Sequence, residues 1–148
     1  MARAVDVGPR DTAQAVSEEN IEVVRALFEA FDRADYETAL QMLDPNVEWQ
    51  VPPGIAIGRE VWRGREEVQK GFSGWLGAWD RFSFEPEEML NHADHVVVSG
   101  TQIARGRGSG VEVRLPTFHV FTLRSGKVAR HRSFRDRTEA LETAELRE

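Results

Sequence analysis

Apolar side chains recur at helical spacing through the first half of the chain. Between residues 17 and 33 they lie three, three, one and three positions apart, which is the spacing of one helical face. These side chains are Ile21, Val24, Leu27, Phe28 and Phe31. Ser17 suits the N-cap position, and the two glutamates after it place negative charge in the first turn. We therefore predict a helix over residues 17–33, preceded by a disordered leader at residues 1–16.

A second, shorter apolar set predicts another helix over residues 36–43. The segment Asp44-Pro45-Asn46 is expected to end it, because the residue before a proline avoids helical geometry. Alternation of apolar and polar residues then predicts a strand at residues 47–51. An irregular loop is expected to follow, through Gly58 and Trp62.

A third helical face predicts a helix over residues 65–79. Its apolar members are Val68, Phe72, Trp75, Leu76 and Trp79. Gly71, Gly74 and Gly77 weaken this helix, at a cost of about 1 kcal/mol each relative to alanine. Their spacing of three brings them near one another, so we expect another element to approach closely there.

From residue 81 onward the apolar pattern changes to the period of a β-strand. Four strands are predicted, at residues 81–91, 95–105, 111–124 and 127–135. The turns between them are short and rich in Gly, Asp or Ser, so successive strands are expected to pair as antiparallel hairpins. A short charged helix is expected at residues 138–148. Helices followed by an antiparallel meander predict an α+β domain, with the helices on one face of a curved sheet and a pocket between them.

Length and composition narrow the functional classes. The chain has 148 residues, enough for one domain, here predicted at residues 17–148. Nineteen basic and 25 acidic residues give a net charge of −6, which argues against nucleic acid and anionic membranes as partners. There is no cysteine, and the four histidines lack zinc-binding spacing, so we expect no metal site. No apolar stretch approaches membrane-spanning length, and no signal segment is evident, so a soluble, cytoplasmic protein is expected.

The order of helices and strands resembles the nuclear transport factor 2-like superfamily, and within it the SnoaL-like branch, named for a polyketide cyclase. The resemblance covers residues 17–146. It rests on patterns that include Asp44-Pro45-Asn46-Val47-Glu48-Trp49, Trp62-Arg63-Gly64-Arg65-Glu66-Glu67-Val68, His119-Val-Phe121, Gly126-Lys127-Val128 and Asp136-Arg-Thr-Glu139-Ala-Leu141. It implies a cone-shaped α+β barrel wrapped around the helices, with an internal pocket, no cofactor and a homodimer. Because the superfamily spans isomerases, cyclases, dehydratases, hydrolases and proteins without chemistry, it does not fix a reaction.

His119 is the principal candidate for chemistry. It lies on the odd-numbered face of the strand at residues 111–124, where the other side chains except Thr117 are apolar. The near-neutral intrinsic pKa of an imidazole suits proton transfer. The alternative is a buried histidine that only hydrogen-bonds to a neighbouring strand.

Two further residues could assist His119. Asp136 follows the last strand, and the resemblance to SnoaL-like cyclases implies a general base there. However, Asp136-x-x-Glu139 is also a helix-capping pattern, and we favour the structural interpretation. His131 shares a strand face with Ser133, and that face is expected either to line the cavity or to lie outside, in solvent or at a dimer surface.

The remaining candidates would bind a ligand. Four aromatic residues could wall a pocket for a flat molecule, or could be plain core: Tyr36, Trp49, Trp62 and Phe72. Glu88 is a possible pocket carboxylate. Arg105, with Asp136, could contribute to an epoxide hydrolase-type site, although no second strand aspartate is well placed for one.

Two functions remain open on this basis. One is cofactor-free acid/base chemistry on a small, largely apolar, carbonyl-containing molecule, of isomerase, cyclase or hydrolase type. The other is a non-catalytic ligand-binding or dimeric interaction module. A homodimer is also expected because strands 95–105 and 111–124 carry apolar residues on both faces, as in Val96 to Val98.

Overall fold

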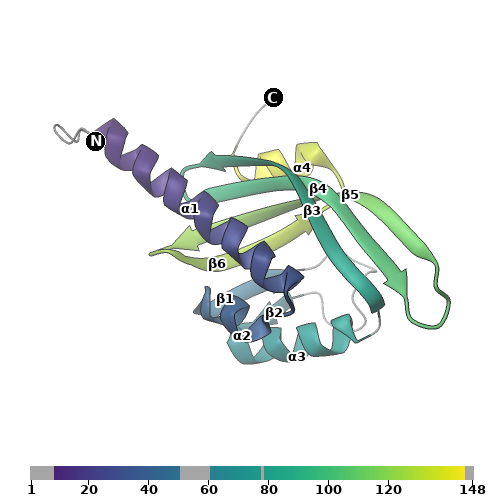
Figure 1. The fold of residues 1–148 in the computed structure, drawn as a ribbon. Helices are drawn as coiled ribbons and strands as arrows, with labels where there is room; N and C mark the ends of the chain where they lie inside the picture. The colour runs from purple at the N-terminus through teal and green to yellow at the C-terminus, as the bar shows by residue number, and fades with distance from the viewer. Residues whose placement is uncertain (1–8, 51–60, 78, 146–148) are drawn as a thin grey trace.

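The computed structural model of the chain describes residues 9–50, 61–77 and 79–145 (Figure 1). Their helices and strands follow the order α1 (Pro9–Asp32), α2 (Tyr36–Gln41), β1 (Leu43–Gln50), β2 (Val61–Arg63), α3 (Gly64–Leu76), β3 (Trp79–His92), β4 (His95–Gly106), β5 (Glu112–Arg124), β6 (Lys127–Phe134) and α4 (Arg137–Thr143). The predicted α+β class is confirmed.

The six described strands form one curved, unclosed sheet in the order β2-β1-β6-β5-β4-β3. The four long strands β3 to β6 pair antiparallel throughout, as the short turns between them predicted. The pairing of β1 was not predicted. This strand lies parallel to β6, with Trp49 opposite His131, and antiparallel to the short strand β2.

The helices cover both faces of this sheet. Helix α1 crosses one face, here called the inner face, and packs with α3 on the main core (Figure 1). That core includes Val24 and Leu27 of α1, Val68 of α3, and Phe121 of β5. Burial of such side chains, at roughly 25 cal/mol per Å² of apolar surface, is the main force that holds the layers together. The predicted position of both helices on one face agrees with this arrangement.

Helix α4 covers part of the opposite, outer face. Its residues Ala140 and Leu141 pack on Val97 of β4 and Val120 of β5, and these four form a second buried cluster with Ala144. Apolar residues on both faces of β4 and β5 were expected to need a second copy of the chain as cover. For Val97 and Val120, the chain supplies that cover itself.

Helix α1 begins earlier than the sequence predicted. The described helix starts at Pro9 and not at Ser17, so residues 9–16 are helical, whereas residues 1–8 of the expected leader lie outside the described part. The sequence placed Pro9 in the expected leader. Proline is tolerated at the first position of a helix, because the N–H that it lacks would have no partner there.

Two other boundaries also differ from prediction. Asp44-Pro45-Asn46 belongs to strand β1 and does not end a helix, since α2 stops at Gln41. The pairing of β1 with β6 is irregular between Leu43 and Glu48, so Pro45 fits without a ladder hydrogen bond.

Trp79 begins strand β3, although it was assigned to the third helix. Helix α3 ends at Leu76, and Gly77 follows it, a common residue just beyond a helix end. Trp62 lies in strand β2 and not in a loop. Residue 51, the expected end of the first strand, and the rest of the predicted loop up to residue 60 lie outside the described residues.

Gly71 of α3 permits a close approach of this helix to Trp62 of β2. A Cβ atom at Gly71 would overlap the Trp62 indole, so this position needs a residue without a side chain. The expectation of close approach therefore applies to Gly71. Nothing lies within 4 Å of a Cβ atom placed at Gly74.

Candidate active site

His119 and His131 meet on the inner face of the sheet. In the antiparallel pairing of β5 with β6, His119 lies opposite Ser133 and Phe121 lies opposite His131. The two histidines are therefore diagonal neighbours on one face. Nδ1 of His119 lies 2.9 Å from Nε2 of His131, which is a hydrogen-bond distance. The inner face of β6 is thus the one that carries His131.

Aromatic rings from three other elements surround the pair. The ring of Phe84, from β3, meets His119 edge-on with centroids 4.6 Å apart, and Phe28 of α1 lies 5.8 Å away. On the other side, Trp49 of β1 stacks on His131 with centroids 3.8 Å apart and an interplanar angle of 20°. The environment is apolar on both sides of the imidazole pair.

Burial keeps both imidazoles neutral at pH 7. Loss of hydration disfavours the charged form and lowers the pKa of His119 to about 4. The pKa of His131 is lowered well below its usual value, first by burial and second by the neighbouring His119, while the backbone of Gln50 acts weakly in the opposite direction. With both rings neutral, the N–H of one donates to the lone pair of the other.

Two nitrogens of the pair, Nε2 of His119 and Nδ1 of His131, are buried without a hydrogen-bond partner among the described residues. Nε2 of His119 is shielded from solvent and makes no such bond. The nearby hydroxyl of Ser133 lies 3.4 Å from Nδ1 of His119 and 3.4 Å from Nε2 of His131. It therefore lies beside the two nitrogens that bond to each other, and not beside Nε2 of His119. A buried polar atom without a partner costs about 1–3 kcal/mol. Such an atom is therefore a place where an additional molecule would be bound favourably.

The predicted aromatic residues are partly brought together. Trp49 and Phe72 pack edge to face with centroids 5.1 Å apart, and Trp62 lies 5.9 Å from Phe72. Of these, Trp49 also contacts the histidine pair. Tyr36 lies at the rim of the cluster, 37% exposed and 6.2 Å from Phe31.

Asp136 is placed away from the histidine pair. It is the exposed N-cap of α4, and its carboxylate accepts a hydrogen bond from the backbone N–H of Thr138 at 3.4 Å. This is the structural role that the capping pattern predicted. Within the described residues no hydrogen bond joins it to His119 or His131.

The other two charged candidates belong to ion pairs on the outer face. Glu88 lies 3.2 Å from Arg137, and Arg105 lies 3.0 Å from Glu112. Both pairs are substantially exposed. Conversely, Phe28 and Phe84 contact His119 although the sequence did not mark them as site residues. The alternation in Phe82-Ser-Phe84 was the available signal, but it did not reveal which strand would lie beside His119.

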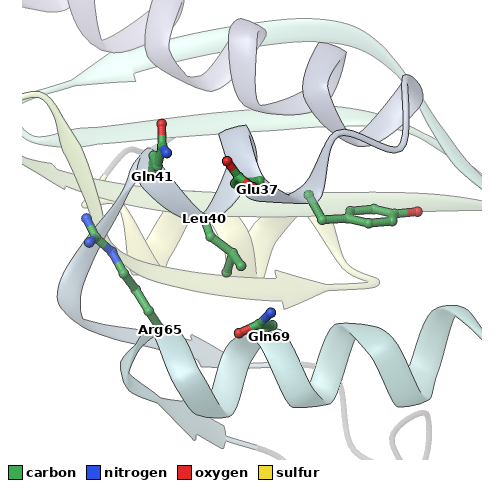
Figure 2. Close-up of a pocket in the computed structure, with 6 residues that line it drawn as sticks. Glu37, Leu40, Gln41, Arg65 and Gln69 are labelled. Atoms are coloured by element: carbon green, nitrogen blue, oxygen red, sulfur yellow. The ribbon is translucent and has the colours of Figure 1, made fainter.

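A separate cavity of about 330 Å³ lies between α2 and α3 (Figure 2). Glu37, Leu40 and Gln41 line it from α2, and Arg65 and Gln69 line it from α3 (Figure 2). The guanidinium of Arg65 donates to the backbone carbonyl of Leu43. Arg65 therefore holds the start of β1 in place. Tyr36, which the sequence marked as a ligand-binding candidate, also lines this cavity.

No helix of the described residues is long and apolar enough to cross a lipid bilayer.

Comparison with known proteins identifies the fold and its relatives. A family model described as a SnoaL-like domain matches residues 24–131. No curated protein sequence matches the chain. Among solved structures, an NTF2-like protein of unknown function from Burkholderia pseudomallei K96243 is 25% identical, with a TM-score of 0.73 over 84% of this chain and 95% of that one.

Two other solved structures carry more specific names. TerC, co-crystallized with polyporic acid, is 26% identical, with a TM-score of 0.73 over 86% of this chain and 98% of that one. A putative SnoaL-like polyketide cyclase from Jannaschia sp. CCS1 is 22% identical, with a TM-score of 0.71 over 95% and 96% of the two chains. The latter similarity concerns the fold alone.

Proposed function

The chain belongs to the SnoaL-like domain family, and from this premise we propose that it binds a small, largely apolar, carbonyl-containing molecule beside His119 and transfers a proton to or from it without a cofactor. The observation that carries the proposal is the shielded Nε2 atom of His119, which has no hydrogen-bond partner among the described residues. A polar group of the ligand would bond there, while its apolar body would contact the neighbouring aromatic rings.

The paired imidazoles suit acid/base chemistry. His119 is neutral at pH 7, so one of its ring nitrogens carries a lone pair that can accept a proton. A base whose pKa is about 4 has the strength of an ordinary carboxylate, and carboxylates serve as general bases in enzymes. His131, bonded to the opposite nitrogen, would fix the orientation and tautomer of His119. Isomerases, cyclases and hydrolases of this general kind all need such a proton transfer.

A non-catalytic ligand-binding module is the second candidate. It is favoured by the lack of a carboxylate hydrogen-bonded to either histidine within the described residues, since acid/base enzymes commonly combine two titratable groups of different pKa. In this case Nε2 of His119 would only bond to the ligand, and no product would form.

Binding is tested by ligand-detected NMR with polyporic acid, which the TerC structure suggests as a probe, and with small carbonyl compounds, lactones and epoxides. We expect at least one compound to bind saturably and to shift the NMR signals of the ring nitrogens of His119. His119→Gln should weaken this binding at least tenfold, whereas the exposed His92→Gln is the matched control and should leave it unchanged. Equal binding by wild type and His119→Gln would exclude the proposed site. Product formation then separates the enzyme from the binding module.

We also propose that the chain forms a homodimer and is located in the cytoplasm. Dimerisation is supported by exposed apolar side chains at the start of β5, where Val113 is 42% and Leu115 is 40% exposed, next to Val111 at 61%. Apolar patches of this kind are typical of protein interfaces. Fractionation of the host cells tests the location.

A further inference from the structure

Four polar side chains form a continuous row across the outer face of the sheet. His95 of β4 lies directly opposite Thr122 of β5, Thr122 lies opposite Arg130 of β6, and Arg130 lies opposite Glu48 of β1. Directly opposite residues on neighbouring strands have Cβ atoms about 5 Å apart, so each side chain can contact the next. The row lies on the face opposite His119 and His131, and the proposed function does not use it.

The row borders a cavity that irregular strand pairing creates. Ala129 is an extra residue of β6, because Thr122 pairs with Arg130 while Leu123 pairs with Val128. On its other side β6 pairs with β1 at Leu43 and again only at Glu48. The intervening part of β1 is thus displaced from β6, and it turns at Asp44, whose carboxylate accepts from the backbone N–H of Asn46 at 2.8 Å. Bulges of this kind commonly occur beside functional sites.

The resulting cavity measures about 410 Å³, which is within the range of small-ligand sites. Its lining divides by charge. Hydrogen-bond donors lie on the side of β4, β5 and β6, where His95, Arg124 and Arg130 contribute. Carboxylates lie on the side of β1, where Asp44 and Glu48 contribute. A ligand with one charge of each sign would complement both sides, whereas a simple anion or cation would complement only one.

From this arrangement we propose that the cavity is a second binding site, for a zwitterion of amino-acid size. The carboxylate of the ligand bonds to Arg130 and Arg124, and its ammonium group faces Glu48 and Asp44. His95 lies on the same side as the two arginines and also bonds to the carboxylate of the ligand.

Existing contacts leave these groups available. Nε of Arg130 is 3.8 Å from Glu48, and both side chains are nearly half exposed, so this ion pair is long and weak and can yield to a ligand. A carboxylate bound side by side by a guanidinium fork gains two charge-assisted hydrogen bonds in its place. His95, by contrast, is fixed in orientation, because its Nδ1 lies 3.0 Å from the hydroxyl of Thr122.

The neighbouring Arg132 strengthens the positive side. It lies opposite Val120 on the same outer face, two residues along β6 from Arg130. Its Nε atom is buried and makes no hydrogen bond within the described part of the chain. Loss of hydration and, second, the charge of Arg130 lower the pKa of Arg132, while the charge of Glu48 acts in the opposite direction.

The test is an amide NMR titration of the full chain with a pool of the free α-amino acids, followed by the individual members of the pool. We expect at least one amino acid to cause saturable shifts at Thr122, Arg130 and Glu48 at millimolar concentration or below. Propionate, propylamine and inorganic phosphate supply one charge sign only, and they should bind at least tenfold more weakly. Absence of saturable shifts from every amino acid would overturn the proposal, as would equal binding of propionate or phosphate.

Two variants and a matched control locate the effect. Arg130→Gln should weaken amino-acid binding at least tenfold, and Glu48→Gln should weaken it while leaving the weak binding of propionate unchanged. Arg114→Gln, an exposed arginine elsewhere on β5, should have no effect. Unchanged binding by Arg130→Gln would overturn the assignment. Shifts at the same amides that grow with protein concentration alone would also overturn it, because the occupant would then be a second copy of the chain.

Discussion

The indole of Trp49 lies face to face with the imidazole of His131, with ring centroids 3.8 Å apart. Two distant segments meet in this contact, because β1 runs parallel to β6 and Trp49 is the direct neighbour of His131. The stacked indole excludes water from one face of the imidazole and holds its ring plane. It therefore helps to set both the low pKa of His131 and the direction of its bond to His119.

We predict that Trp49→Leu raises the pKa of His131 toward its ordinary value, because water then reaches the exposed face of the ring. The substitution should also lower the free energy of unfolding by about 2–4 kcal/mol, as expected for loss of a large buried aromatic side chain. Histidine-detected NMR across a pH series measures the first effect, and chemical denaturation measures the second.

Trp62→Leu is the matched control for this variant. It removes an indole from the same aromatic cluster, where Trp62 packs on Phe72, but among the described residues the Trp62 ring does not contact His131. It should lower stability without moving the pKa of His131. An equal pKa change in both variants would mean that general loosening of the core, and not the stacked ring, controls the imidazole.

The sequence predicted the fold more completely than the site, for physical reasons. The four long strands follow from period-two alternation and local turn residues, and both are local signals. The parallel pairing of β1 with β6 joins residues far apart in the sequence and leaves no local signal. Without it, the contact of Trp49 with His131 could not be inferred. The sequence showed the apolar strand face around His119, but it did not reveal which side chains of other elements would pack against His119.

Pro9 and Pro45 illustrate the same limit. Pro9 was placed in the expected leader, and Pro45 was expected to end a helix, because the residue before a proline avoids helical geometry. Proline also lacks a backbone donor. Proline is tolerated where that donor has no partner, which here means the first turn of α1 and an irregular part of β1. Whether a partner exists depends on the tertiary structure, so the local sequence could not decide either case.

A substitution at Gly71 tests the close approach of α3 to β2. Alanine is the better helix former, and in an open position it would stabilise α3 by about 1 kcal/mol. At Gly71, however, the added methyl group would overlap the Trp62 indole, so we predict that Gly71→Ala lowers the free energy of unfolding. Gly74→Ala has open space and should instead be neutral or stabilising. Chemical denaturation of both variants measures the sign of each change in the free energy of unfolding. A stabilising Gly71→Ala would contradict the close packing of Gly71 on Trp62.

For the homodimer, we predict a mass of two chains by light scattering at micromolar concentration. Leu115→Lys should shift the protein toward monomer, because it places a charge in the exposed apolar patch proposed as the interface. Arg124→Lys, at the opposite end of β5, keeps its charge and should leave the mass unchanged. A monomeric wild type would exclude the dimer. A dimeric Leu115→Lys variant would show that the interface does not include the exposed apolar patch at Leu115.

If the protein is an enzyme, His119→Gln should reduce turnover of a substrate found by screening by about 10²–10⁴-fold, the usual contribution of one general acid or base. Glutamine keeps polarity and approximate size, so the fold should persist and circular dichroism should be unchanged. Arg105→Gln changes an exposed outer-face residue and should leave turnover unaffected. Turnover by His119→Gln equal to that of wild type would remove His119 from the mechanism.

The buried histidines also make a prediction about stability and pH. The pKa of His119 falls from about 6.5 in an unfolded chain to about 4 in the folded protein, so between these values the unfolded chain binds more protons. Stability must therefore decrease as the pH falls below about 6.5, and this contribution levels off below about 4. His119 alone should contribute a loss on the order of 2 kcal/mol between pH 7 and pH 5, and His131 should add to it in the same direction. Urea denaturation at pH 7, 6 and 5 measures the slope. His119→Gln should make it shallower while His92→Gln leaves it unchanged, and a wild-type stability that is constant or rises toward pH 5 would show that the pair is not held neutral by burial.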